Sequence, residues 1–535
     1  MFETQIDLTL FFSFIKQVKR AIFPLLIVIL TIISVGYFTS FLQNGLGLAY
    51  NDARSHLDIG RRVVESLKPG LAQLGSVWLP LTHLLMVPTI WNDFMWHSGL
   101  AGAIQSMAGF VATGLLIYKI LEKLNVGILG RLVGVAVFVA NLNILYLQST
   151  AMTELPLLAT MTAGCYYLIK WHQSDNILDV IKSAFWIMLS SLVRYDGWFL
   201  FIAASGLIFL RLLIKKGYST AEGAMILFAT LAGFGIALWF LWNQLIFSDA
   251  LYFALGPFSA HSQQAQLSNA GNLPSKYNLF LSTKIYLYAL FYNSYTLPVL
   301  LALFGIWSLW LDRKITQDIK IASLSLLTPL GFNITALFLG FSVLFVQGIS
   351  GNTWFNIRYG IMLMPAVAVF IGVLIDRART LRPVIIGLLA FVLFFAFANQ
   401  DAVTIDDARV GSSQKNVSEV ASYLAKNAAD QPGFILISVA SHDAIIFSSG
   451  LPMSRFIHEG TGAYWTAATT APDRWARWII MRTHDENDLA WKFVSRSSGF
   501  RFYKLAEHYP FADVYEIDET LVGQLHTEPV FKNQK

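Results

Sequence analysis

Long apolar runs separated by short polar segments dominate the first 400 residues of the sequence. Runs of about 20 apolar residues are long enough to cross a bilayer as helices. The hydropathy pattern predicts about eleven crossings. These expected spans are Ile22–Leu42, Gly99–Leu121, Gly127–Leu147, Leu155–Lys170, Ile177–Val193, Trp198–Ile214, Ala224–Phe247, Tyr286–Leu311, Ile321–Phe345, Ile361–Ile375 and Pro383–Ala398.

One stretch has a different pattern, with charged and apolar residues alternating at helical spacing. Residues 43–98 form the first loop, and in it Arg54–Leu67 carries Leu57 and Val64 on one face and Asp58 and Arg62 on the other. This pattern predicts an amphipathic helix lying on the membrane surface. Pro69 and Gly70 follow it and predict its end.

Basic residues indicate the orientation of the spans. Lys16, Lys19 and Arg20 precede the first run, and most other cations fall in alternate short loops. The positive-inside rule then places the N-terminus in the cytoplasm and the first loop outside. No small-residue cleavage site follows the first run, so we expect a retained span and not a signal peptide. The setting that we expect is the plasma (inner) membrane.

The pattern changes at Asp401, where the sequence acquires the composition of a water-soluble domain. Asn416–Ala429 has the periodicity of an amphipathic helix, and Phe434–Val439 that of a buried strand. Helical and strand-like pieces then alternate through Trp478–Met481, Phe500–Tyr503 and Val514–Ile517. We therefore expect a transmembrane domain at 1–400 and a small extracytoplasmic α/β domain at 401–535.

Composition supports the membrane assignment and excludes other classes. The chain is 55% hydrophobic and only 13% charged, against roughly 25% charged in soluble domains. Its mean hydropathy is +0.55, and its isoelectric point of about 9.0 reflects cations in loops, so we expect no nucleic-acid partner. The single cysteine, Cys165, lies in an apolar run, which leaves neither a disulfide framework nor a thiolate metal site.

Once this topology is drawn, polar residues distant in sequence fall on the outer side of the membrane. They are Asp52 and His56 in the first loop with His83 further along it, Glu154 in STAMTELP, Arg194 and Asp196 in RYDG, and Arg358 and Tyr359 in NTWFNIRYG. Carboxylates and arginines at one depth suit a reaction on a lipid-linked phosphate. A carboxylate can take a proton from an acceptor hydroxyl, and an arginine fork can hold a phosphate.

Each of these residues also has a purely structural interpretation. Asp52 suits a helix N-cap, Glu154 suits the first turn of a helix, and Asp196 with Gly197 suits a turn. Arg358 suits a cation reaching the interface from the end of a span. The histidines His56 and His83 suit packing or head-group contacts.

Five segments carry a resemblance to a known family. YNDARSHLDIGRRVV with QLGSVWLPLTHLL, then NILYLQSTAMTELP, LVRYDGW and FNIRYGIMLMP, resemble the multi-spanning glycosyltransferases of the GT-C fold. The nearest branch contains the protein O-mannosyltransferases and the aminoarabinose transferases that modify lipid A, which is glycosyltransferase family 39-like. The resemblance covers roughly the first 400 residues and the FIHEGTGAYW segment of the tail.

The resemblance implies a sugar carried on a polyprenyl phosphate or diphosphate and transferred with inversion to a lipid, glycan or protein acceptor. It implies that Asp52 is the base or acceptor-orienting group, that Glu154 is the second acidic residue, and that Arg358, aided by Arg194, holds the donor phosphate. His56, His83, Asp196 and Tyr359 are the further expected substrate-binding residues. We expect no cofactor. Asn51 precedes Asp52 where many members carry two adjacent acids, so a bound divalent metal stays open but is not supported by the sequence.

Two other functions remain open from the sequence. A transporter or lipid flippase is the first, although such proteins usually show repeated halves and polar sites near the bilayer midplane, and neither pattern is evident here. A non-catalytic receptor or assembly subunit at the outer surface is the second. The sequence does not specify the sugar, the acceptor or the prenyl length.

Overall fold

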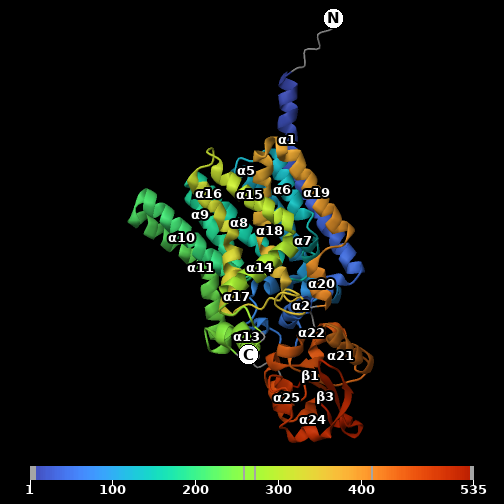
Figure 1. The fold of residues 1–535 in the computed structure, drawn as a ribbon. Helices are drawn as coiled ribbons and strands as arrows, with labels where there is room; N and C mark the ends of the chain where they lie inside the picture. The colour runs from blue at the N-terminus through green and yellow to red at the C-terminus, as the bar shows by residue number, and fades with distance from the viewer. Residues whose placement is uncertain (1–7, 257–258, 270, 272, 411–413, 531–535) are drawn as a thin grey trace.

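A computed structural model describes residues 8–256, 259–269, 271, 273–410 and 414–530. Helices make up nearly all of the part before residue 411, and α1 extends to one end of this helical body, far from the C-terminal sheet at the other (Figure 1). The elements of this part are α1 (Leu8–Gln43), η1 (Leu46–Leu48), α2 (Asn51–Val64), η2 (Leu71–Leu74), α3 (Leu81–Ile90), α4 (Asp93–His97), α5 (Leu100–Lys123), α6 (Ile128–Val139), α7 (Leu142–Leu147), α8 (Glu154–Ser174), α9 (Ile177–Ser191), α10 (Asp196–Lys216), α11 (Tyr218–Phe247), α12 (Tyr252–Leu255), α13 (Ala260–Asn269), α14 (Leu279–Ser294), α15 (Thr296–Leu311), α16 (Gln317–Ser323), η3 (Leu324–Leu327), α17 (Thr328–Leu339), η4 (Ile357–Leu363), α18 (Met364–Arg377), η5 (Arg379–Leu381), α19 (Arg382–Ala398) and α20 (Val403–Val410).

The helices confirm a multi-pass membrane protein. Within the described residues, seven helical segments are long and apolar enough to span a bilayer, or up to eight if a bent pair is one span. The remaining predicted spans are also helical, but α6 and α9 are shorter, with 12 and 15 residues.

Four predicted spans are not single α-helices. Ile321–Phe345 runs through α16, η3 and α17, which ends at Leu339, and Ile361–Ile375 begins in η4 and continues in α18. Tyr286–Leu311 lies in α14 and α15, which meet at 105°. The bend is at Tyr295, whose φ of 60° is in the left-handed region, and one such residue ends an α-helix. Gly127–Leu147 is split into α6 and α7 at Asn141, whose side chain accepts a hydrogen bond from the Ile144 amide and starts the second helix.

The C-terminal part is a small α/β unit, as the sequence predicted (Figure 1). Its elements are α21 (Gln414–Asn427), β1 (Phe434–Ile437), α22 (Val439–Ser449), η6 (Met453–Arg455), β2 (Phe456–Ile457), η7 (Glu459–Thr461), α23 (Ala463–Thr470), α24 (Pro472–Trp475), β3 (Ala476–Met481), α25 (Leu489–Val494), η8 (Ser498–Phe502), β4 (Tyr503–His508), β5 (Asp513–Ile517) and η9 (Glu519–Gln524).

These strands form one five-stranded mixed sheet in the order β2-β1-β3-β5-β4. β1 is parallel to β2 and β3, whereas β5 is antiparallel to β3 and β4. The apolar run FILI of β1 is buried at every position, as a central parallel strand requires. The predicted strand at Phe500–Tyr503 is wrong, because most of it is the 3-10 helix η8 and β4 begins only at Tyr503.

Helix α2 forms where the sequence predicts it, but its surroundings differ from the prediction. Its charged face does not meet solvent, because α22 of the C-terminal unit covers it: Asp58 is fully buried and accepts hydrogen bonds from Trp96 Nε1 at 3.1 Å and the Phe447 amide at 3.0 Å. Arg62 donates to Asp443 at 3.1 Å. The amphipathic pattern therefore reflects packing between two protein layers and not a helix on the membrane surface.

Candidate active site

Three helix starts meet beneath the C-terminal unit and bring together residues far apart in sequence. Asp52 lies in the first turn of α2, Glu154 is the first residue of α8, and Arg358 lies in η4. The backbone N–H groups at a helix N-terminus favour a nearby carboxylate, which accounts for the two acids at these positions. Asp52 is not the N-cap of α2, because Tyr50 holds that place.

The Arg358 guanidinium joins the two predicted catalytic acids. Its Nη2 donates to Asp52 Oδ2 at 2.5 Å, and its Nε donates to Glu154 Oε1 at 3.0 Å. The Arg358 side chain is 6% exposed and that of Glu154 is 0% exposed, whereas that of Asp52 is 39% exposed. A buried arginine whose fork faces two carboxylates is held in one orientation, and Asp52 is the member of the group open to a ligand.

Arg194 extends this cluster from the loop between α9 and α10. Its Nη1 donates to Glu154 Oε1 at 3.4 Å and to Thr153 Oγ1 at 3.3 Å, and its Nε donates to Asp196 Oδ2 at 3.4 Å. Both arginines lie over the Tyr359 ring, with the Arg194 and Arg358 Cζ atoms 4.7 and 5.4 Å from its centroid. Six of the eight residues predicted from the sequence, Asp52, Glu154, Arg194, Asp196, Arg358 and Tyr359, therefore form one connected group.

The two predicted histidines contact each other beside this group. His56 Nδ1 lies 2.8 Å from His83 Nε2, and the His56 ring packs on Trp78 with centroids 4.3 Å apart. Both histidines are buried. Burial, together with the nearby positive charges of Arg358 and Arg194, lowers the pKa of His56 to about 3, so His56 is neutral at physiological pH. This geometry agrees with the packing interpretation of the pair.

Sequence reasoning missed Asp407, which lies on α20 after the last predicted span. Its Oδ2 is 4.0 Å from Arg358 Nη1 and 3.0 Å from the Tyr50 hydroxyl, and the Tyr50 ring centroid is 4.9 Å from the Arg358 Cζ. α20 is fixed to the helical body because Asn143 Oδ1 accepts from the amide and hydroxyl of Thr404. The only signal in the sequence was a pair of acids, Asp406 and Asp407, in a segment that we assigned to the soluble tail.

One carboxylate oxygen of the cluster is left without a protein donor. Glu154 Oε2 is buried and has no hydrogen-bond partner among the described residues. An unpaired buried acceptor is unfavourable by about 1–3 kcal/mol, so a hydroxyl group that reached this oxygen would be bound favourably. In the same described part of the chain, no group of three or more His, Cys, Asp or Glu side chains has an arrangement that could hold a metal ion.

Comparison with proteins of known structure places this arrangement in a known fold. No protein-family model matches the sequence, and no curated protein matches it significantly by sequence. Among solved structures, ArnT from Cupriavidus metallidurans, bound to undecaprenyl phosphate, aligns with a TM-score of 0.54 over 91% of this chain and 98% of its own, at 11% identity. The chain has a GT-C fold.

A second solved structure supports the same fold. The oligosaccharyltransferase AglB from Archaeoglobus fulgidus, in complex with an inhibitory peptide and a dolichol-phosphate, aligns with a TM-score of 0.51 and 9% identity, over 86% of this chain and 69% of its own. The alignment with ArnT from Cupriavidus metallidurans also extends into the C-terminal α/β unit, because residues 1–400 alone are only about three quarters of the 535. Both parts of the chain thus belong to one architecture.

Proposed function

We propose that this protein is an inverting glycosyltransferase that moves a sugar from a polyprenyl-phosphate or diphosphate donor to an acceptor hydroxyl at the extracytoplasmic face of the membrane. The observation that carries the proposal is the contact of Arg358 with both Asp52 and Glu154, and of Arg194 with Glu154, where α2, α8 and η4 begin. The undecaprenyl phosphate bound to ArnT and the dolichol-phosphate bound to AglB support a lipid phosphate as the donor's carrier.

Arg358 and Arg194 are the groups that would bind the donor phosphate. Arg358 has two nitrogens in hydrogen bonds to carboxylates, and the Asp52 partner is the more exposed one. A phosphate oxygen could replace Asp52 as the acceptor of the Arg358 Nη2 hydrogen bond, and the new bond would again join a cation to an anion. Donor binding would then both fix the leaving group and free the Asp52 carboxylate to face the acceptor.

Asp52 would act as the base of the reaction. The acceptor oxygen forms a bond to the anomeric carbon while the bond from that carbon to the phosphate oxygen breaks. The acceptor proton passes to Asp52, and the electron pair of the broken bond stays on the polyprenyl phosphate. Negative charge grows on this phosphate, so two preorganised guanidiniums beside it are the expected large stabilising contribution.

Glu154 would hold both arginines in place and face the sugar. Its Oε1 accepts from Arg358 and Arg194, while Oε2 has no partner within the described residues. A sugar hydroxyl is a donor of the right kind for Oε2. We further propose that the protein lies in the plasma (inner) membrane with its N-terminus in the cytoplasm and the α/β unit outside, as the positive-inside pattern predicts.

The Asp52→Asn variant tests the proposal. The substitution keeps the side-chain size and removes the base, so transfer of a radiolabelled sugar from a polyprenyl-phosphate donor should fall by at least about 100-fold while expression and thermal stability stay at the level of the unmodified protein. Asp249→Asn, an exposed acid in another loop, is the matched control. Assays in detergent exclude transport as the source of signal, and unchanged turnover in Asp52→Asn would refute the mechanism.

A further inference from the structure

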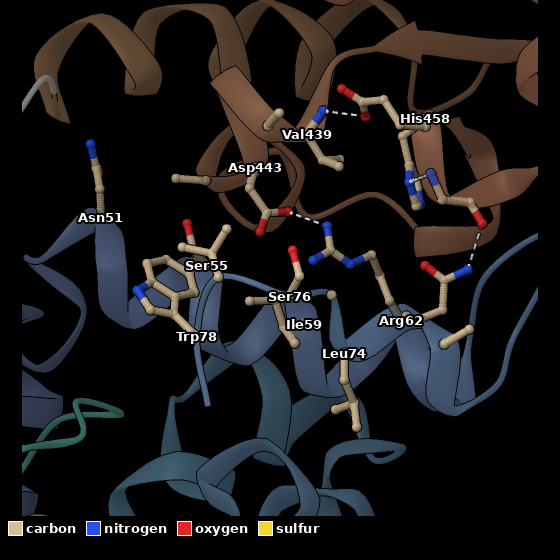
Figure 2. A pocket seen from close by; sticks show the side chains of 18 of the residues that line it. Asn51, Ser55, Ile59, Arg62, Leu74, Ser76, Trp78, Val439, Asp443 and His458 are labelled. Carbon is tan, nitrogen blue, oxygen red and sulfur yellow. Dashed lines mark hydrogen bonds and ion pairs between the residues drawn. The ribbon is translucent and has the colours of Figure 1, made fainter. Parts of the chain in front are cut away.

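A cavity of about 540 Å³ lies between α2 and the C-terminal α/β unit. Figure 2 shows Asn51, Ser55, Ile59 and Arg62 on one side, and Val439, Asp443 and His458 of the C-terminal unit on the other. The four α2 residues recur every three or four positions, so they share one face of that helix. This volume is in the range of sites that bind small organic molecules.

Two buried hydrogen-bond donors in the cavity wall have no acceptor among the described residues. His458 Nδ1 accepts from the Gly460 amide at 3.1 Å, so in the neutral ring Nε2 carries the hydrogen. His458 is 1% exposed, and its Nε2 has no partner. Arg62 Nε is also buried without a partner, although its Nη1 donates to Asp443 Oδ1 at 3.1 Å. Two such groups in one cavity wall point to a ligand with acceptor oxygens.

The wall also holds two carboxylates, and both already accept from the protein: Asp443 from Arg62 Nη1, and Glu459 from the Ser438 hydroxyl and the Val439 amide. A ligand that donates hydrogen bonds is compatible with them. The Asp443 and Glu459 carboxylates line the cavity, and together they offset the charge of Arg62. The site therefore carries no excess positive charge that would select a phosphate or sulfate. Hydroxyl groups suit it, because each one both donates and accepts.

Aromatic and apolar groups complete the wall. Trp78, Ile59 and Leu74 also line the cavity (Figure 2). A flat aromatic face next to fixed polar groups fits the apolar C–H face and the polar edge of a sugar ring. The cavity wall thus offers hydrogen-bond donors, hydrogen-bond acceptors and the Trp78 ring. This combination indicates a ring compound that carries several hydroxyl groups.

The α2 residues that line the cavity extend from Arg62 to Asn51, the neighbour of the proposed base Asp52. From Arg62 back to Asn51, α2 rises about 1.5 Å per residue, or about 16 Å in all. Asn51 directly precedes Asp52 in this helix. We propose that this cavity binds the carbohydrate part of the acceptor, with one sugar at Arg62 and His458 and the reacting hydroxyl near Asp52. This inference rests on the proposed function and specifies its acceptor class.

Binding of the full-length, detergent-solubilised protein to a printed glycan array tests the inference without any donor. Ala440 lines the cavity and is exposed, so Ala440→Trp fills it without removing a buried contact. We expect the unmodified protein and Ala440→Ser to bind a restricted set of saccharides, and Ala440→Trp to bind them at least 10-fold more weakly. His458→Phe, which removes the Nε2 donor, should weaken the same saccharides, with the exposed His484→Phe as its control.

Three outcomes would overturn the inference. They are the absence of saccharide binding, binding that Ala440→Trp leaves unchanged, and selective binding of serine- or threonine-containing peptides in place of saccharides. Hydrolysis of a polyprenyl-phosphate sugar is measured on the same preparations. It distinguishes a failure of the carbohydrate-binding inference from a failure of the proposed glycosyltransferase function. If Ala440→Trp hydrolyses the donor normally but binds no glycan, both proposals hold. If the unmodified protein binds glycans in this cavity and neither transfers nor hydrolyses the donor, only the proposed function fails.

Discussion

Arg358 and Asp52 are 306 positions apart in the chain, yet their side chains are joined at 2.5 Å. The arginine is buried and the aspartate is partly exposed. The pair therefore links a buried side chain of the helical body to a partly exposed one. Because Arg358 also binds Glu154, movement of Asp52 away from it leaves the arginine fixed.

Arg358→Lys should keep the positive charge and lose the reaction. A lysine ammonium is a point charge and does not reproduce a planar fork that faces two carboxylates. We expect transfer to fall by about 100-fold, with most of the loss in donor binding. The measurement is transfer rate against donor concentration, and Arg131→Lys, at a partly exposed ion pair with Glu122, is the control. Equal behaviour of the two variants would contradict the assignment of Arg358.

Asp407→Asn should weaken donor binding although Asp407 lies outside hydrogen-bond range of Arg358. The carboxylate lies 3.0 Å from the hydroxyl of Tyr50, whose ring packs on the Arg358 guanidinium. We expect KM for the donor to rise by about 10-fold, with kcat less affected, and a stability loss of about 1 kcal/mol for the weakened hydrogen bond. Asp406→Asn, on the exposed neighbour, should change neither value. If both substitutions had equal effects, the loss would come from disturbing α20 in general and not from the Asp407 carboxylate.

His56 should make the protein less stable in mild acid. Burial and the nearby arginines lower its pKa to about 3 from its ordinary 6.5, so between these values the unfolded chain binds a proton that the folded protein does not. Its contribution to stability is complete above pH 6.5 and is lost as the pH falls toward 3, by about 1.4 kcal/mol per pH unit.

The unfolding midpoint in detergent at about pH 7 and pH 5 measures this effect. The His56→Gln variant should show a smaller decrease between the two pH values than the unmodified protein. The exposed His484→Gln should show the same decrease as the unmodified protein. A pH dependence that is identical in all three proteins would rule out a neutral buried His56.

Gly360→Ala should disturb the site from two residues away. A Cβ at this position would lie 2.2 Å from the Ala289 carbonyl oxygen of α14, so η4 and Arg358 would have to shift. Such overpacking typically costs about 1–3 kcal/mol, and we expect loss of both thermal stability and transfer. Gly206→Ala, in α10 with nothing within 4 Å, should keep stability and activity. A stable and active Gly360→Ala would show that η4 can move freely.

The apolar runs predicted the positions of the helices well, since a bilayer demands long apolar segments. They did not predict the 105° bend between α14 and α15. Pro298, in the first turn of α15, is compatible with a helix start there, but nothing in the apolar run indicates the positive φ of Tyr295 that turns the chain. The order of charged and apolar residues also located α2. The pattern alone did not distinguish a charged face covered by water from one covered by another part of the protein, which is why the membrane-surface prediction was wrong.

The sequence predicted which residues of the candidate site lie at the same depth in the membrane, because the topology of the chain determines that depth. The topology placed Asp52, Glu154 and Arg358 on the same side of the membrane, and the structure shows them in contact. It gave no indication of Asp407, because its role depends on how α20 folds back after the last span. Contacts of this kind arise from tertiary packing, which hydropathy does not encode.

The cover that α22 forms over α2 has a consequence for engineering. Arg54 donates to Ser448, Arg62 to Asp443, and Asp58 accepts from the Phe447 amide. If another α/β unit were grafted onto this membrane body, these three charged side chains would be buried in the new interface without their hydrogen-bond partners. A chimaera must therefore exchange residues 51–64 together with the unit above them, as one cassette.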